Sequence, residues 1–192
     1  MSERKYNMKN IVVISVDSLR ADYCPWLVDT KFETPTISDL SSSGVSFKRA
    51  IAPGEATSVS IPQIFTGNFL PRIHQDEPAE ELSQYHDTFP QKFSRSGYST
   101  IGFTTNPFTS REFGFHNGFD HFEDFFGRDK SLLSKVRSYV RDNWRNQIGS
   151  SLRLGLNLLG QGDLTVGWRD YYNELITAAQ EADEPFLLWV FL

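Results

Sequence analysis

The sequence has little of what several classes of protein require. Its single cysteine, Cys24, excludes internal disulfide bonds and a cysteine-rich metal site. No apolar run reaches the length of about 18 residues that a membrane-spanning helix needs. Lys and Arg number 19 against 24 Asp and Glu, and the resulting net charge of -5 argues against a nucleic-acid partner, which requires a concentrated basic surface. The four histidines form no pair at the spacing of a metal site.

The sequence also shows no internal repeat and no low-complexity linker. Its first residues, MSERKYNMKN, are polar and lack the apolar segment of a signal peptide. We therefore expect a cytoplasmic protein. Apolar residues make up 39% of the 192 positions, which is enough for a hydrophobic core in one domain or slightly more.

Short apolar segments predict the strands of a parallel sheet. Residues 11–16 (IVVISV) and 185–192 (PFLLWVFL) are apolar on both faces, which is typical of strands that are covered by helices on both sides. Residues 45–51 alternate well enough for another strand, and residues 98–105 complete the set. A strand at 185–192 would lie inside the sheet, because it is apolar throughout.

Segments with helical character separate these strands. Pro35 in a first turn and Gly44 after a last turn delimit a short helix between them. Further helices are predicted over residues 56–67, 88–96, 129–144, 148–162 and 168–182. Because strands and helices alternate, the fold class is α/β with a mostly parallel sheet.

Two places along the chain could carry chemistry. Asp17 directly follows the first predicted strand, where open α/β sheets build their ligand sites, although it could also cap the next turn. The stretch ATSVSIPQIFTG at 56–67 holds three hydroxyl residues, Thr57, Ser58 and Ser60. One of them could simply cap the helix, since Ser and Thr are common caps.

The other interpretation makes one of these hydroxyls a nucleophile. The N-terminus of a helix favours anions such as phosphate and sulfate, which its free N–H groups can bind. A metal ion bound by Asp17 would favour the deprotonated form of such a hydroxyl. His74 follows the helix after a short loop and could reach the same anion.

Five ordered segments resemble the sulfatase family of the alkaline phosphatase superfamily. Residues 11–23 (IVVISVDSLRADY) are similar to the family's opening strand and metal-binding loop. The other matching segments are 34–50 (TPTISDLSSSGVSFKRA), 60–67 (SIPQIFTG), 106–124 (NPF through GFDHFED) and 185–192. The resemblance implies an alkaline-phosphatase-like α/β/α sandwich, of which residues 1–192 form the N-terminal part. By the same resemblance, we expect a helical insertion at about 129–182 and a C-terminal part that residues 1–192 do not include.

The resemblance also implies roles for individual residues. Asp17 matches the family's first aspartate metal ligand, and Ser18 stands where many sulfatases have a second aspartate. Thr57 lies ten positions before Gly67, the place of the Cys or Ser that becomes formylglycine in the motif C/S-x-P-S-R. Val59 and Ile61 replace the Pro and Arg of that motif, so no formylglycine is expected. Phospho-branches of the superfamily use an unmodified Thr or Ser, and Thr57 fits them.

The expected activity is therefore metal-dependent hydrolysis or transfer at a sulfate or phosphate ester. Thr57 would be nucleophile and metal ligand, Asp17 a metal ligand, and Ser58, Ser60 and His74 contacts to the substrate. The resemblance implies one divalent ion, Ca²⁺, Mg²⁺ or Mn²⁺, whose remaining ligands follow the 185–192 segment in the family. Two other interpretations stay open. One is a non-catalytic sulfatase-like domain that binds a ligand or partner, and the other is a truncated chain with an unfinished sheet.

Overall fold

A computed structural model of the protein describes residues 8–54, 56–69, 87–124 and 168–192. The chain divides into two compact units. The small unit is Val16–Ala52, and the sheet unit combines the described residues up to Ser15 with those from Pro53 to Leu192. Neither contains a described helix that is long and apolar enough to cross a membrane.

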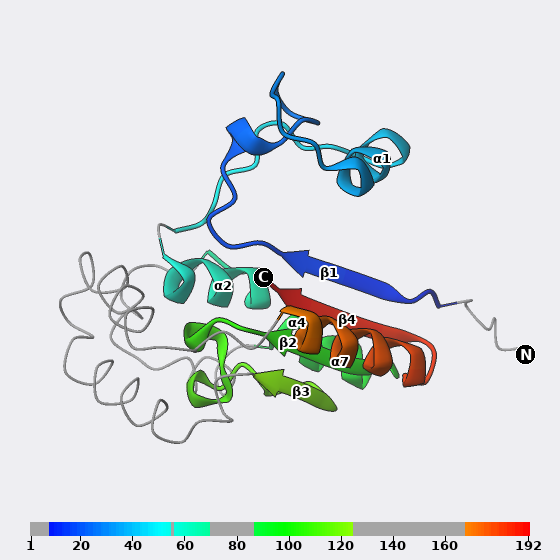
Figure 1. Cartoon of the computed structure of the whole chain (residues 1–192). Coiled ribbons are helices and arrows are strands. Elements are labelled where there is room, and N and C mark those ends of the chain that lie inside the picture. Colours follow the sequence, from blue (N-terminus) through cyan, green and yellow to red (C-terminus); the bar gives the residue numbers. More distant parts are fainter. Residues whose placement is uncertain (1–7, 55, 70–86, 125–167) are drawn as a thin grey trace, which may run out of the picture. The chain divides into compact units, whose positions relative to one another are not determined.

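The sheet unit is built on four strands (Figure 1). They lie in the order β1-β4-β2-β3, and every described pairing is parallel. Their bounds are β1 Ile11–Ser15, β2 Ser99–Thr104, β3 His121–Asp124 and β4 Phe186–Phe191. The predicted parallel sheet is thus confirmed, and so is the inner position of the strand at the end of the sequence.

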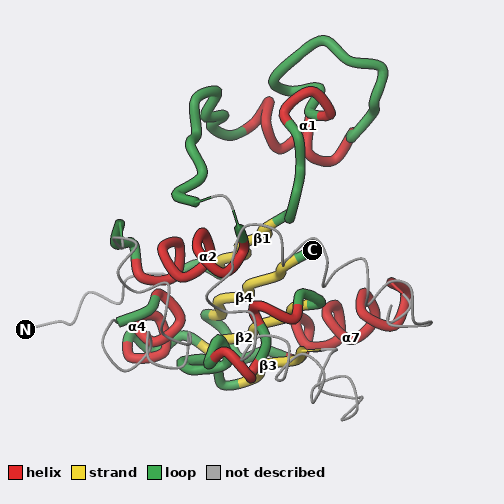
Figure 2. Tube along the Cα trace, turned by 90° about the vertical axis from the view of Figure 1, so that its left-hand side faces the viewer, coloured by secondary structure: helices red, strands yellow, loops and turns green. Residues whose placement is uncertain are grey.

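Helices cover both faces of this sheet. Figure 2 shows α2 (Thr57–Thr66) and α4 (Phe89–Arg95) on one side and α7 (Trp168–Glu181) on the other. Side chains of β4 alternate between the two layers, since successive residues of a strand point to opposite faces. Trp189 and Phe191 belong to the core beneath α2, whereas Leu188 and Val190 belong to the core beneath α7. The fold is therefore an α/β/α arrangement.

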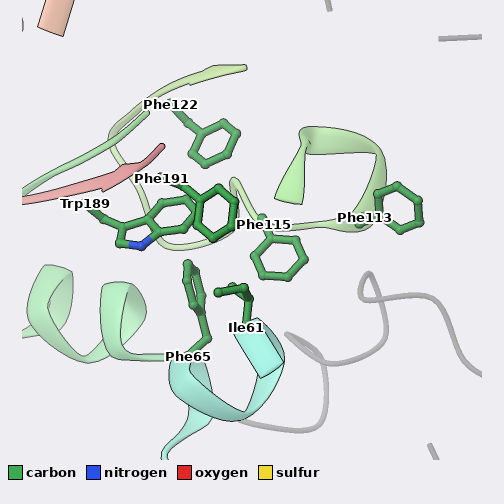
Figure 3. Packing of buried hydrophobic residues seen from close by; sticks show 7 residues of the cluster. All are labelled: Ile61, Phe65, Phe113, Phe115, Phe122, Trp189 and Phe191. Carbon is green, nitrogen blue, oxygen red and sulfur yellow. The ribbon is translucent and has the colours of Figure 1, made fainter. Parts of the chain in front are cut away.

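Aromatic side chains fill the core on the α2 face (Figure 3). Phe65 of α2 stands edge-on to Trp189, with ring centroids 4.9 Å apart, and edge-on to Phe115 at 5.1 Å. Gly102 makes room for this packing, because a Cβ there would lie 2.6 Å from the ring of Phe122. Phenylalanine, the most frequent aromatic residue of the sequence, thus supplies most of this core.

The fully buried residues of the core on the α7 face are aliphatic apart from Phe103 and Tyr171. Tyr171 is buried and stands edge-on to Phe103 of β2, at 6.0 Å between ring centroids. Its hydroxyl donates a hydrogen bond to the carbonyl of Phe191 at 3.3 Å. Burial also raises the pKa of Tyr171 above its ordinary value of 10.0. The predicted amphipathic helix at 168–182 is confirmed, and its apolar face packs on the sheet.

The small unit contains the short helix α1 (Pro35–Ser43) and a single turn, η1 (Ala21–Tyr23). α1 begins after Thr34 and ends at Gly44, as the sequence predicts. The rings of Tyr23 and Phe32 stack with centroids 4.3 Å apart. Cys24 is the one fully buried hydrophobic residue among those described in this unit.

The predicted strand at 45–51 is wrong. These residues have no regular structure apart from a turn at 48–49, and Val45, Phe47 and Ile51 are 81%, 77% and 91% exposed. Alternation of apolar and polar residues is a local pattern, whereas a strand exists only where a neighbour completes its hydrogen bonds. No strand of the described sheet pairs with this segment.

Two further strands differ from expectation. β1 is parallel, as predicted, but it is an edge strand of the described sheet, so Val12 and Ile14 remain more than half exposed. β3 was not predicted, because its residues, His-Phe-Glu-Asp, have little strand propensity. Its register is set just before the strand, where the Asp120 carboxylate accepts hydrogen bonds from the N–H and hydroxyl of Thr100 at 2.8 and 3.0 Å. The helices predicted at 129–144 and 148–162 lie outside the described residues.

Candidate functional site

The first turn of α2 holds the hydroxyl residues that the sequence singles out. Ala56 is the N-cap residue, with extended backbone angles (φ -138°, ψ 155°), and its carbonyl accepts the first helical hydrogen bond, from Ser60 N–H at 2.8 Å. Thr57 is therefore the first residue inside the helix. The capped-helix interpretation of the three hydroxyls is wrong, because the cap position is occupied by a residue that has no side-chain oxygen.

The N-cap residue of α2 therefore supplies no side-chain oxygen to the N–H groups of the first turn. Ala56 makes no side-chain cap bond, and the first turn contains no acidic residue that would oppose the positive end of the helix dipole. Phosphate, sulfate and carboxylate groups bind at such termini, where backbone N–H groups point outward. This supports an anion-binding role for the segment.

The predicted site residues of this segment differ in their surroundings. Thr57 is half-buried. Ser60 donates its hydroxyl proton to the carbonyl of Gly54 at 2.8 Å. The side chain of Ser58 and the whole of His74 lie outside the described residues.

Packing fixes α2 against the sheet. Ile61 and Phe65 point from the helix into the aromatic core, toward Trp189 and Phe191 (Figure 3). Gly67 ends the helix in the left-handed conformation (φ 67°), and its N–H binds the carbonyl of Gln63 at 2.9 Å. Both apolar anchors follow Thr57 by one to two turns, so the position of the hydroxyl is set by the core.

Asp17 lies in the small unit, two residues after β1. It is exposed, and its Oδ1 accepts a hydrogen bond from the hydroxyl of Ser18 at 3.2 Å. Ser18 adopts the left-handed backbone conformation (φ 57°), which is uncommon for a residue other than glycine. Thr57 belongs to the sheet unit, so the two expected metal ligands lie in different units of the chain.

Arg20, in the loop after Asp17, already has an anionic partner. Its guanidinium donates two hydrogen bonds to Asp22, at 2.9 and 2.7 Å, and stacks over Tyr23. These hydrogen bonds lower the pKa of Asp22. Arg20 therefore forms an ion pair with an exposed carboxylate of its own loop.

The described residues do not complete a metal centre. They contain no group of three or more His, Cys, Asp or Glu side chains that could hold an ion. Asp17 and Thr57 offer oxygen atoms, which suit Ca²⁺, Mg²⁺ and Mn²⁺, but such ions take about six ligands. Two oxygen ligands do not fit an ion of this kind without further ligands.

A polar cluster lies at the carboxyl end of β2, where the residue pattern predicts no site. The hydroxyls of Thr104 and Thr109 lie 2.5 Å apart, and Thr104 also accepts a hydrogen bond from Asn106 N–H at 3.0 Å. Nearby, Asp124 accepts a hydrogen bond from Arg111 N–H at 2.6 Å. The NPF and GFDHFED segments signal this region by resemblance, and its hydrogen bonds hold the loop after β2 in place.

Comparison with known protein families gives a match. The sulfatase family model matches residues 9–192. No curated protein and no solved structure gives a significant match. Since the family match covers nearly the whole chain, the protein belongs to the sulfatase family.

Proposed function

We propose that the protein is a sulfatase-like hydrolase or transferase in which Thr57 attacks a phosphate or sulfate ester. The observation that carries this proposal is the position of Thr57 as the first residue of a helix whose N-cap residue, Ala56, has no side-chain oxygen. Its hydroxyl stands beside the backbone N–H groups of the first turn, which would bind the anionic group of the ester. Ser58, Ser60 and His74 are further proposed contacts to that group.

The reaction would proceed through a covalent intermediate. In the phosphoryl case, the Oγ of Thr57 forms a bond to phosphorus while the bond from phosphorus to the alcohol oxygen breaks. The alcohol leaves with the proton that Thr57 loses. Water then attacks the phosphothreonine, which releases inorganic phosphate and restores the hydroxyl; with an alcohol in place of water, the same step is a transfer.

Phosphoryl chemistry is favoured over sulfuryl chemistry by the residues around Thr57. Conversion to formylglycine needs a Cys or Ser with Pro and Arg two and four positions later, and this chain has Thr57, Val59 and Ile61 there. Thr57 therefore acts as an unmodified hydroxyl. An unmodified hydroxyl matches the phospho-branches of the superfamily.

Members of the family generally use a divalent metal. We propose that Asp17 and Thr57 are two of its oxygen ligands, and that the remaining ligands come from outside the described residues. Such an ion would supply positive charge next to the reacting oxygen. Turnover measured with Ca²⁺, Mg²⁺ or Mn²⁺ in turn identifies the ion.

Turnover of an aryl phosphate and an aryl sulfate tests the proposal. Thr57→Ala should abolish turnover, whereas Thr57→Ser should retain part of it because the hydroxyl remains. Thr66→Val is the matched control, since it removes another hydroxyl at the opposite end of the same helix. Mass spectrometry of the trapped enzyme should find one phosphoryl group on the peptide that contains Thr57. Equal turnover by Thr57→Ala and wild type would refute the assignment.

A second function, a non-catalytic sulfatase-like domain that binds an anion or a partner, rests on the incomplete metal ligand set among the described residues. Calorimetric titration of the chain with Ca²⁺, Mg²⁺ or Mn²⁺ separates the two functions. Stoichiometric binding that Asp17→Asn weakens supports the enzyme. The absence of both metal binding and turnover supports the non-catalytic domain.

A further inference from the structure

The entry segment of α2, Pro53 and Gly54, is held by hydrogen bonds from side chains of the helix itself. Besides the bond from Ser60 to the carbonyl of Gly54, Gln63 Nε2 lies 3.3 Å from the carbonyl oxygen of Pro53 and 3.2 Å from that of Val59. Ser60 and Gln63 are three positions apart and so share one face of the helix. Gln63 is buried, with 6% of its surface exposed. Two consecutive carbonyls before the helix are thus bound from within it.

The fit between this entry segment and the helix is close. A Cβ on Gly54 would lie 2.5 and 2.8 Å from the side-chain atoms of Val59 and 3.4 Å from the hydroxyl of Ser60. Only glycine lets the backbone approach at this distance. The chain before the helix therefore rests directly on its first turn, on the side where Ser60 and Gln63 bind it.

These contacts compensate for a first turn that is poorly held by its backbone. The N-cap residue Ala56 contributes no side-chain oxygen. Pro62 has no N–H, so the carbonyl of Ser58 lacks the helical hydrogen bond that another residue would donate. Helix ends fray readily, and a first turn that lacks a side-chain cap and a backbone hydrogen bond frays more readily still.

We infer that Ser60 and Gln63 are positioning residues for Thr57, a role that rests on the proposed function of that threonine. By binding Gly54 and Pro53, they hold the chain on both sides of Thr57 and fix the direction of its hydroxyl. Ser60 also stays a proposed contact to the substrate, which its hydroxyl could donate to only by giving up its bond to the Gly54 carbonyl.

Side-chain coupling constants of Thr57, measured by NMR on the whole chain, test this without requiring turnover. The wild type should show one χ1 rotamer at Thr57. Ser60→Ala and Gln63→Met should each give rotamer averaging and raise the amide exchange rate of Ser60 or its replacement about fivefold, the effect of losing one hydrogen bond. Ser60→Thr, which keeps the hydroxyl, should restore the single rotamer.

Thr66→Val is again the matched control. It removes a side-chain hydrogen bond of the same helix, from Thr66 Oγ1 to the carbonyl of Pro62 at 3.0 Å, at the end remote from Thr57. Circular dichroism establishes whether each variant folds. If Ser60→Ala does not fold, the rotamer and exchange rate of Gln63→Met test the inference alone. If both variants leave the rotamer and the exchange rate as Thr66→Val leaves them, the inference is overturned.

Kinetics then separate this inference from the proposed function. Ser60→Ala should lower kcat about tenfold or more with little change in KM, because a misdirected nucleophile still binds its substrate. If Thr57→Ala does not alter turnover while Ser60→Ala changes the rotamer, the proposed function fails and the positioning contact stands. If Thr57→Ala abolishes turnover and Ser60→Ala matches Thr66→Val in kcat, the positioning role fails and the function stands.

Discussion

Replacing Ala56 provides the most direct check on the role of the α2 terminus. Ala56 has the extended backbone of an N-cap residue, so a serine there needs no backbone change to accept a hydrogen bond from the first turn. Exchanging Ala for Ser, Asn or Asp at an N-cap stabilises a protein by about 1 kcal/mol. For a chain of this length, that corresponds to a rise in Tm of about 2–4 °C. Ala56→Asp should add about 0.3–1 kcal/mol through the helix dipole.

The same change should weaken anion binding. If phosphate binds the α2 terminus, a concentration ten times its Kd stabilises the wild type by about 1.4 kcal/mol. The carboxylate of Ala56→Asp would compete for the same N–H groups and repel the anion. The variant should therefore be more stable than the wild type in chloride, and phosphate should stabilise it much less.

Urea unfolding followed by circular dichroism measures both effects, in chloride and in phosphate at equal ionic strength. Thr88→Ala serves as the control, because Thr88 is the N-cap residue of the other helix on the same face and its hydroxyl donates a hydrogen bond to the Gln91 side chain at 3.2 Å. Thr88→Ala should lose about 1 kcal/mol and keep the full response to phosphate. Ala56→Asp with an undiminished response to phosphate would refute anion binding at this terminus.

Two further predictions concern the sheet unit. Tyr171→Phe should cost about 1 kcal/mol near pH 8, since it removes the hydrogen bond to the Phe191 carbonyl. Unfolded tyrosine ionises near pH 10 while buried Tyr171, with its raised pKa, stays protonated, so wild-type stability should fall by about 1.4 kcal/mol per pH unit above pH 10 relative to the variant. A constant difference in urea unfolding from pH 8 to 11 contradicts this. Gly102→Ala should destabilise by about 1–3 kcal/mol, because the added Cβ meets the ring of Phe122; unchanged urea unfolding would exclude that clash.

Several elements could be predicted because their signals are local. Residues 186–191 form an inner strand, as an apolar run without polar interruption requires. Gly67 ends α2 because only a residue that tolerates a positive φ closes the helix there. The order of the motifs and the position of Asp17 after β1 predict which residues belong to the candidate site. The contacts around each of these residues depend on distant parts of the chain, so the sequence does not predict them.

The sequence by itself determined the α/β class and the membership of the sulfatase family. It also determined the parallel strands at 11–15 and 186–191 and the helix at 57–66. Propensity, periodicity and motif order suffice for these, because they are properties of neighbouring residues. Only the tertiary structure decided that 45–51 is not a strand and that 121–124 is one, because strands depend on partners distant in the sequence. It also decided that Ala56, not a hydroxyl residue, is the N-cap of α2. The residue that becomes the N-cap depends on how the entry segment packs on α2, and this packing is made by the contacts of Gly54 with Val59 and Ser60.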